Sequence, residues 1–312
     1  MNNSTPFFSV IIPLYNKEHF IEACLQSVLE QHFKNYEIII VDDGSTDASL
    51  AKLKNVNHEN LVIVKQANKG AAAARNKGVQ LAKAKWIAFL DADDLWKENH
   101  LSEFYKAIEQ FPDEAVFTSR MSIIEPNNSI RLAEYNFRLS KDLQALSYFK
   151  NSEKNDLLNT SGVLIKKTFF LQLNGFNEQI YSGQDTDLFI RIGLQKKVVF
   201  NPISTFLHYK TSENNISKTP RFSERLQLLA NYQSEAENNP YLLKYLDLNR
   251  FSIYLRSKIH GDETWKRAKK QIDQSNLNAK QVFLMQLPSW LLKTMKIIQF
   301  QLFRLGINKS AF

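Results

Sequence analysis

The chain has 312 residues, 44% of them hydrophobic, so it can bury a sizeable core and hold one large domain with an appendage. Its single cysteine, Cys24, excludes a disulfide framework or a cysteine metal site and is expected in the core. The excess positive charge lies in residues 251–312, which hold 11 Lys or Arg and 3 Asp or Glu, whereas residues 1–250 hold 29 of each sign. The first residues of the chain do not resemble a signal peptide, so we expect a cytoplasmic protein.

Strands and helices are predicted to alternate through the first third of the chain. Apolar, β-branched runs predict strands at residues 8–12, 36–41, 61–64 and 86–90, and helical spacing or alanine content predicts helices at about 20–29, after 48 and at 71–82. Such alternation predicts an α/β fold with a mostly parallel sheet and helices on both faces. Polar clusters follow each strand, at residues 13–16, 42–47, 68–70 and 91–94. If the sheet is parallel, these clusters meet along one rim.

Asp91 and Asp93 come directly after the fourth strand, where ligands of open parallel sheets bind. Two carboxylates one residue apart can hold a hard divalent cation, which in turn holds phosphate oxygens. The alternative is structural, because Asp93 or Asp94 could cap a helix expected over residues 96–110.

Asp42 and Asp43 end the second strand in the same way. Ser45 or Thr46 could cap the next helix, but that interpretation leaves the two acids unexplained. Adjacent carboxylates repel each other unless a hydrogen-bond donor or a cation shares them, and a ribose or a base N–H is such a donor.

Four motifs in this order resemble the inverting nucleotide-sugar glycosyltransferases of family 2, whose nucleotide-binding fold is called GT-A. They are Val-Ile-Ile-Pro-Leu-Tyr-Asn at 10–16, Ile-Val-Asp-Asp-Gly-Ser-Thr-Asp at 40–47, Asn-Lys-Gly at 68–70 with Ala-Arg-Asn-Lys-Gly at 74–78, and Phe-Leu-Asp-Ala-Asp-Asp at 89–94. One such motif would be weak, whereas four in register are specific. The resemblance covers about the first two thirds of the chain.

The resemblance implies a donor site and a divalent metal, manganese or magnesium. It implies that Pro13 and Tyr15 flank the nucleobase and that Asp43 accepts a hydrogen bond from the base or ribose. Gly70, Arg75, Asp91 and Ala92 would line the donor site, and Asp91 and Asp93 would form the DxD pair, with Asp93 the direct metal ligand.

Residues 175–191 resemble the acceptor-side segment of that family, and Asp185 falls on the position of the catalytic base. The alternative is that Asp185 caps a helix over residues 187–194. Gln184 stands where the family usually has a glutamate, which removes a charge that would help raise the pKa of the base.

The family often supplies a histidine from a later loop to the metal or diphosphate, but Ser212 stands at that position. His208 lies four residues earlier and could take this role or be structural, and Lys210 could reach a diphosphate.

The basic C-terminal region carries apolar residues at steps of four and three: Leu291, Met295, Ile298, Leu302 and Leu305. Charged residues interrupt it too often for it to span a bilayer, but a helix at an anionic membrane surface fits the pattern. Packing on the catalytic domain fits equally well, because periodicity does not show what covers an apolar face.

The sequence thus predicts a GT-A-like domain with a nucleotide-sugar half at 1–114 and an acceptor half at 115–215, then a helical region at 216–312. The expected activity is inverting transfer from a UDP-sugar to a glycan or lipid-linked hydroxyl at the inner face of the plasma membrane. A non-catalytic, nucleotide-sugar-binding or membrane-associated descendant is the alternative.

Other protein classes fit less well. Leu95 departs from the pattern of dehalogenase-type phosphotransferases, and residues 13–16 lack the glycines of a dinucleotide-binding turn. The basic region also lacks a nucleic-acid-binding motif.

Overall fold

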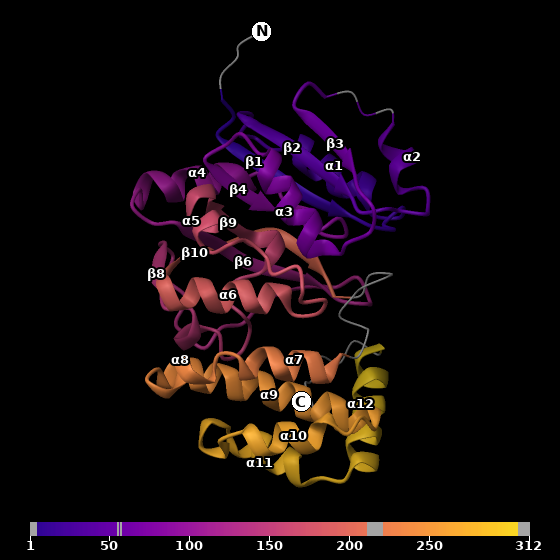
Figure 1. The fold of residues 1–312 in the computed structure, drawn as a ribbon, viewed down its shortest axis with the longest axis vertical. Coiled ribbons are helices and arrows are strands. Elements are labelled where there is room, and N and C mark those ends of the chain that lie inside the picture. Colours follow the sequence, from indigo (N-terminus) through magenta and orange to yellow (C-terminus); the bar gives the residue numbers. More distant parts are fainter. Residues whose placement is uncertain (1–4, 55, 57, 211–220, 305–312) are drawn as a thin grey trace. The chain divides into compact units, whose positions relative to one another are not determined.

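The computed structural model describes residues 5–54, 56, 58–210 and 221–304, drawn as a ribbon in Figure 1. The chain divides into two compact units, Met1–Asn215 and Ile216–Phe312. The first unit contains a ten-stranded sheet with helices around it, and the second is built from helices.

Strands and helices alternate regularly in the first half of unit 1 and less regularly after it. The first half contains β1 (Phe8–Leu14), α1 (Ile21–Leu29), β2 (Tyr36–Asp42), α2 (Ser49–Leu53), β3 (Leu61–Lys65), α3 (Ala71–Leu81), β4 (Trp86–Phe89), β5 (Leu95–Trp96) and α4 (His100–Gln110). The rest contains β6 (Val116–Ile124), β7 (Ile130–Leu132), β8 (Gln144–Leu146), β9 (Val163–Lys166), α5 (Lys167–Gln172), α6 (Gln184–Gln195) and β10 (Val198–Tyr209). The four strands predicted in the first third are therefore confirmed.

The central sheet has the strand order β3-β2-β1-β4-β9-β6-β10-β5, with β7 paired to β6 and β8 to β10. Strands β1 to β4 are parallel to one another, as are β6 and β10, whereas β9 runs antiparallel between β4 and β6. Every residue of β2 is buried, as expected of a strand covered on both faces. The predicted mostly parallel α/β fold is confirmed.

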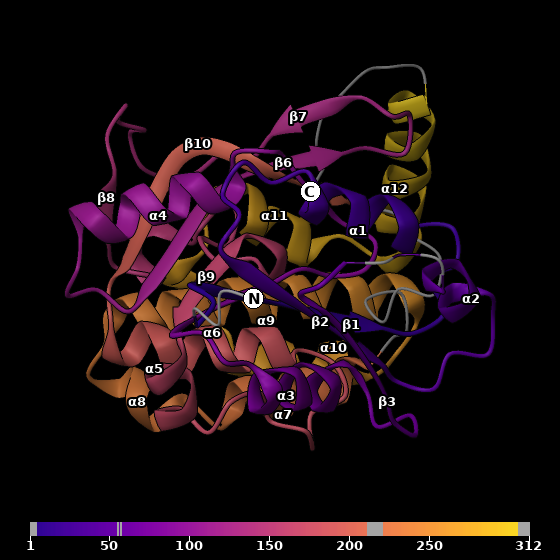
Figure 2. The same cartoon turned by 90° about the horizontal axis from the view of Figure 1, so that it is seen from above.

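Alternate side chains of β1 face two different layers of helices, because successive side chains of a strand point to opposite faces. Phe8, Val10, Ile12 and Leu14 belong to a core cluster that includes apolar residues of α1 and α4. On the other face α3 lies close to β1, and a Cβ added at Gly78 would meet Ile11 Cγ2 at 2.4 Å. Figure 2 shows these elements from above. Helices thus cover both faces of the sheet.

Cys24 of α1 is fully buried in this core, as expected, and burial raises the pKa of its thiol well above the usual value. Its Sγ lies 3.6 Å from the carbonyl oxygen of Asp91, directly beneath the end of β4.

The helix expected at residues 96–110 is wrong at its start, because α4 begins at His100 and residues 95–96 form strand β5. Trp96 pairs with Phe206 of β10, and its indole Nε1 donates to the carbonyl oxygen of Ser161 at 2.7 Å. A buried indole needs such an acceptor, and this tertiary pairing outweighs the local helical pattern.

Unit 2 consists of helices that pack around one long, central helix. In chain order they are α7 (Phe222–Ala230), α8 (Gln233–Glu237), α9 (Pro240–His260), α10 (Thr264–Gln271), α11 (Ala279–Gln286) and α12 (Ser289–Arg304). Asn239 is the N-cap of the central helix α9, and its side chain accepts from Leu242 N at 3.1 Å; Gly261, in the left-handed conformation, is the C-cap. Inside it, Arg250 forms a fully buried ion pair with Asp247 at 2.9 Å.

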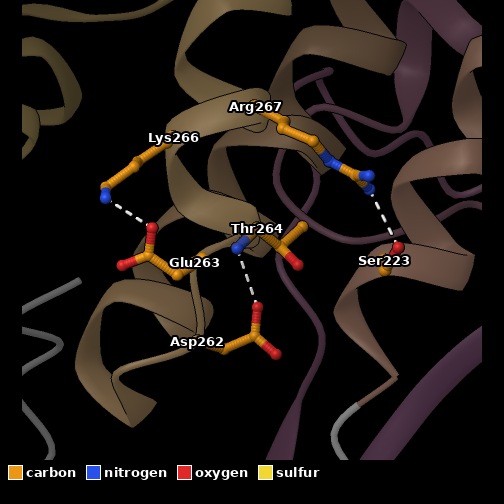
Figure 3. Close-up of a pocket in the computed structure, with 6 residues that line it drawn as sticks. All are labelled: Ser223, Asp262, Glu263, Thr264, Lys266 and Arg267. Atoms are coloured by element: carbon orange, nitrogen blue, oxygen red, sulfur yellow. Dashed lines mark hydrogen bonds and ion pairs between the residues drawn. The ribbon is translucent and has the colours of Figure 1, made fainter.

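A surface hollow of unit 2 is lined by Ser223, Asp262, Glu263, Thr264, Lys266 and Arg267 (Figure 3). Arg267 donates to Ser223 Oγ at 2.9 Å, Asp262 accepts from Thr264 N at 2.8 Å, and Lys266 pairs with Glu263. The Arg267–Ser223 hydrogen bond joins α10 to α7, whereas the other two interactions lie within the start of α10. None of the helices in the described part of the chain combines the length and apolar character needed to cross a bilayer.

Candidate active site

The loops after β1 and β2 are joined by hydrogen bonds at the carboxyl ends of the strands. Asn16 adopts the left-handed conformation with φ of 50°, which asparagine tolerates, and its side-chain Oδ1 accepts from Thr46 N at 2.8 Å. Its backbone N donates to Ser45 Oγ at 3.1 Å. The alternative that Ser45 or Thr46 caps the next helix is wrong, because α2 starts after Ala48 without a side-chain cap. Polar clusters predicted to meet on one rim do so here.

Asp43 joins the loop after β2 to the loop after β3. Its carboxylate accepts from Lys69 N at 2.9 Å, from Gly70 N at 2.7 Å and from Gln66 Nε2 at 2.8 Å. Gly70 has a φ of 90°, a conformation that favours glycine and aims its N–H at the acid. The protein itself thus supplies hydrogen-bond donors to both acids, with Ser45 N donating to Asp42 at 3.2 Å. The role of Asp43 toward a base or ribose stays a prediction.

Asp91 is held by a buried arginine from α3. Arg75 Nη2 lies 2.5 Å from Asp91 Oδ1, and the guanidinium carbon lies 5.2 Å from the centre of the Phe176 ring. Arg75 is only 6% exposed, and among the described residues its Nε and Nη1 atoms have no hydrogen-bond partner. Buried, unsatisfied donors are costly, so these nitrogens favour an oxygen-rich ligand at this position.

Asp93 is paired with Lys17 from the loop after β1, at 2.7 Å between Oδ2 and Nζ. Both side chains are largely buried, with 12% of Lys17 and 15% of Asp93 exposed. The described part of the chain contains no group of three or more His, Cys, Asp or Glu side chains placed to hold a metal ion. The two carboxylates alone therefore do not form a complete, all-protein metal cage.

Asp94 is not a helix cap, contrary to the alternative interpretation, but the centre of a buried network. Its carboxylate accepts from Ser161 Oγ at 2.5 Å and Tyr209 N at 2.9 Å, and lies 3.1 Å from His208 Nδ1. Burial lowers the pKa of His208, but the charge and hydrogen bond of Asp94 outweigh it and raise the pKa to about 9. The network thus fixes the end of β10 against the segment between β4 and β5.

The remaining residues predicted from the resemblance lie on or beside the same rim. Pro13 is the second-last residue of β1, Tyr15 is 42% exposed, and Ala92 is buried between the two acids of the motif. The roles of Pro13, Tyr15 and Ala92 toward a nucleotide stay predictions.

Asp185 lies in the first turn of α6, and the helix begins one residue before it with Gly183 as its N-cap. The alternative that Asp185 caps this helix is therefore wrong. Its Oδ1 accepts from the backbone N of Thr186 at 2.8 Å. Gln184 is buried, and when its amide is oriented to donate, its nitrogen reaches the carbonyl oxygen of Tyr181 at 2.9 Å.

One asparagine that the sequence did not single out ties the acceptor-side segment to α3. Asn76 Nδ2 donates to Phe176 O and to Glu178 Oε1, both at 2.8 Å, and its Oδ1 accepts from Phe176 N at 2.9 Å. Gly175 is required beside it, because a Cβ there would lie 2.7 Å from Asn76 Oδ1. Asn76 directly follows Arg75 in one of the four motifs, and this position could have identified it as a residue of the site.

The polar residues near the end of β10 have structural partners. Lys210 Nζ lies 3.0 Å from Glu125 Oε2, and Glu125 is also paired with Arg131 at 2.6 Å. Ser212, where a histidine was sought, and Leu305 of the C-terminal pattern lie outside the described residues.

Comparison with known proteins shows the family of this chain. The Glycosyl transferase family 2 profile matches residues 9–170, which contain the four motifs on the rim. The chain belongs to glycosyl transferase family 2. Asp185 lies beyond the matched residues, so its role is not part of that finding.

Two curated relatives illustrate the kinds of protein that this chain resembles. The amylovoran biosynthesis glycosyltransferase AmsB of Erwinia amylovora is 28% identical over 64% of this chain and 69% of its own. The UDP-Glc:alpha-D-GlcNAc-diphosphoundecaprenol beta-1,3-glucosyltransferase WfgD of Escherichia coli is 40% identical over 30% of this chain and 37% of its own. Matches to several other curated relatives span only 28 to 42% of their length.

A solved structure shares the fold. Residues 1–349 of S. aureus TarS, crystallised with UDP-GlcNAc, align with a TM-score of 0.65, 18% identity, and coverage of 95% of this chain and 91% of that one. At that identity the likeness shows the fold alone.

Proposed function

We propose that this protein transfers a sugar from a nucleotide-diphosphate donor, a UDP-sugar, to a hydroxyl group of a glycan or lipid-linked acceptor in cell-surface polysaccharide synthesis. The observation that carries the proposal is the buried Arg75 guanidinium beside Asp91, because two of its nitrogens have no hydrogen-bond partner among the described residues and can donate to an oxygen-rich ligand at the rim where the family motifs meet. The names of WfgD and AmsB, and the UDP-GlcNAc bound to TarS, support the choice of donor and product.

The proposed reaction is direct displacement at the anomeric carbon, with inversion. Asp185 removes the proton from the acceptor hydroxyl, whose oxygen forms the new glycosidic bond as the bond to the diphosphate breaks. Arg75 stabilises the negative charge on the leaving diphosphate in this reaction, since a guanidinium binds phosphate oxygens through paired N–H donors.

The donor set fits a divalent cation that is shared with the diphosphate. Magnesium in particular is usually held by one or two carboxylates together with substrate phosphates. Asp93 and Asp91 would hold it, and the described residues place no third His, Cys, Asp or Glu with them to form a metal site, which matches that arrangement. When bound, the metal supplies charge neutralisation for the leaving group.

A thermal-shift panel tests the donor site. UDP, GDP, dTDP and CMP are compared with and without manganese, because a ligand that binds only the folded state raises the melting temperature. We expect a manganese-dependent rise with UDP. Turnover is then tested with UDP-sugars and a polyprenyl-diphosphate-linked acceptor, with the product anomer read by NMR. Binding of UDP without turnover on any acceptor would favour the non-catalytic alternative.

The exposed face of α12 supports a second part of the proposal, contact with an anionic membrane surface. Trp290, Ile297 and Ile298 of this helix are 67%, 59% and 49% exposed, and Phe283 of α11 is 57% exposed. Residues 274–312 carry five Lys or Arg and no Asp or Glu. Exposed aromatic and aliphatic side chains among basic ones suit the interface of anionic lipids.

Co-sedimentation with lipid vesicles tests this contact. We expect binding to vesicles that contain phosphatidylglycerol, weaker binding to pure phosphatidylcholine, and a loss of binding in Trp290→Ser. Leu171→Ser is the matched control, because Leu171 is 52% exposed on α5 of unit 1. Equal binding of all three proteins to both vesicles would contradict the proposed role of α12.

A further inference from the structure

Each of the three carboxylates after β4 is paired with a cationic side chain of the protein itself. Asp91 is paired with Arg75 at 2.5 Å, Asp93 with Lys17 at 2.7 Å, and Asp94 with His208 at 3.1 Å. The partners come from α3, from the loop after β1 and from β10. Each acid of this cluster therefore has a cationic partner from the chain, which a metal ion would have to displace or share.

The ion pair between Lys17 and Asp93 is enclosed by protein, unlike an ion pair on the surface. The backbone of Lys17 is fixed, because its N donates to Ser49 Oγ at 2.8 Å and its O accepts from Ile21 N at the start of α1 at 3.0 Å. The ammonium also lies 5.9 Å from the centre of the Phe20 ring. An ion pair this well enclosed is screened less by solvent than an exposed pair.

A lysine ammonium and a divalent cation compete for the same carboxylate. Both are attracted to Asp93, and a cation that binds the Oδ2 atom must displace the ammonium 2.7 Å away or be repelled by it. Arg75 is less able to move, since it is buried beneath Asp91 and packed over the Phe176 ring. Lys17 has a flexible stem and a point charge that also binds phosphate, so it can exchange one anionic partner for another.

We propose that Lys17 is the resident counter-ion of Asp93 and makes metal binding conditional on the nucleotide. The phosphates of a bound nucleoside diphosphate pair with the Lys17 ammonium in place of Asp93. The Asp93 carboxylate then becomes available to a divalent cation. This inference rests on the proposed function, because it assumes that the rim binds a nucleoside diphosphate. It assigns to Lys17 a positioning role that controls the order in which the two ligands bind.

Manganese binding measured without turnover tests the proposal. Free Mn²⁺ is titrated by electron paramagnetic resonance in the full-length protein, with and without UDP, for the wild type, Lys17→Met and Lys17→Arg. Without UDP we expect Lys17→Met to bind Mn²⁺ at least about tenfold more tightly than the wild type, within the range common for coupled sites. Lys17→Arg keeps the charge and should keep the wild-type dependence on UDP.

Lys52→Met is the matched control for the loss of one positive charge. Lys52 lies on α2 of the same unit and is paired with Glu22 at 2.5 Å, at a site where the acid is 60% exposed. This control should leave the Mn²⁺ affinity unchanged.

An equal Mn²⁺ affinity of the wild type and folded Lys17→Met without UDP would overturn the inference. If Lys17→Met does not fold, the wild type and Lys17→Arg still test the inference. It is also overturned if both of these proteins bind Mn²⁺ as tightly without UDP as with it. Failure of the proposed function is seen separately, as the absence of any UDP-induced thermal shift in the wild type.

Discussion

Replacing Asp94 by Asn should destabilise unit 1 in a pH-dependent way. The pKa of His208 is about 9 in the folded protein against 6.5 for a free histidine, a difference worth about 3 kcal/mol. Because 34% of the His208 side chain is exposed, solvent screening reduces this to about 1–2 kcal/mol. Asparagine also offers one acceptor oxygen where Ser161 Oγ, Tyr209 N and His208 converge, which adds about 1 kcal/mol. Burial raises the pKa of Asp94, so removing its charge also removes a desolvation cost, and we expect a net loss of about 1–2 kcal/mol at pH 6.5.

The dependence on pH follows from the direction of the pKa shift. The pKa of His208 is higher in the folded protein than in the unfolded chain, where it is 6.5. Protonated His208 therefore stabilises the fold fully below pH 6.5, and this stabilisation is lost as the pH rises through about 9. The difference between the wild type and Asp94→Asn should therefore shrink between pH 6.5 and 10. His208→Gln removes the same pair and should flatten the dependence.

Urea unfolding followed by far-UV circular dichroism at several pH values measures these differences. A loss below about 0.5 kcal/mol, or a difference that stays constant from pH 6.5 to 10, would refute the argument that a charged His208 and an ionised Asp94 hold β10 to the segment between β4 and β5.

Three further substitutions test the site and its support. Asp93→Asn should abolish the manganese-dependent part of the UDP thermal shift. Asp185→Asn should spare that shift and lower kcat by roughly 10²- to 10⁴-fold. The opposite pattern in thermal shift and turnover would show that the two roles are misassigned. Gly78→Ala should cost about 1–3 kcal/mol in urea unfolding, because the added Cβ would lie 2.4 Å from Ile11 Cγ2. An unchanged midpoint would mean that α3 can move away from β1.

The sequence predicted the parts of the fold that local patterns determine. Apolar runs located β1 to β4, and their alternation with helices placed the polar clusters on one rim, where Asp43 meets Gly70 and Asn16 meets Thr46. The glycines at 70 and 78 also fit their positions, one for its backbone conformation and one for close packing.

The parts that it did not predict depend on contacts between distant residues. Residues 95–96 form a strand because β10, more than 100 residues later, pairs with them, and Asp94 is buried because Ser161 and His208 supply its partners. The pairing of Lys17 with Asp93 joins residues that no local pattern connects. Residues 125–159 have mixed polarity that predicts no element, and they contain β7, β8 and a short 3-10 helix.

The buried thiol of Cys24 can report on local opening of the core around α1. Because it is the single cysteine and lies in the core under the end of β4, a thiol reagent can modify it only when α1 transiently separates from the sheet. The labelling rate under native conditions therefore measures the free energy of that opening without any engineered probe. A ligand that fastens the loops after β1 and β4 should slow the labelling, so binding can be followed even before a sugar or an acceptor is known.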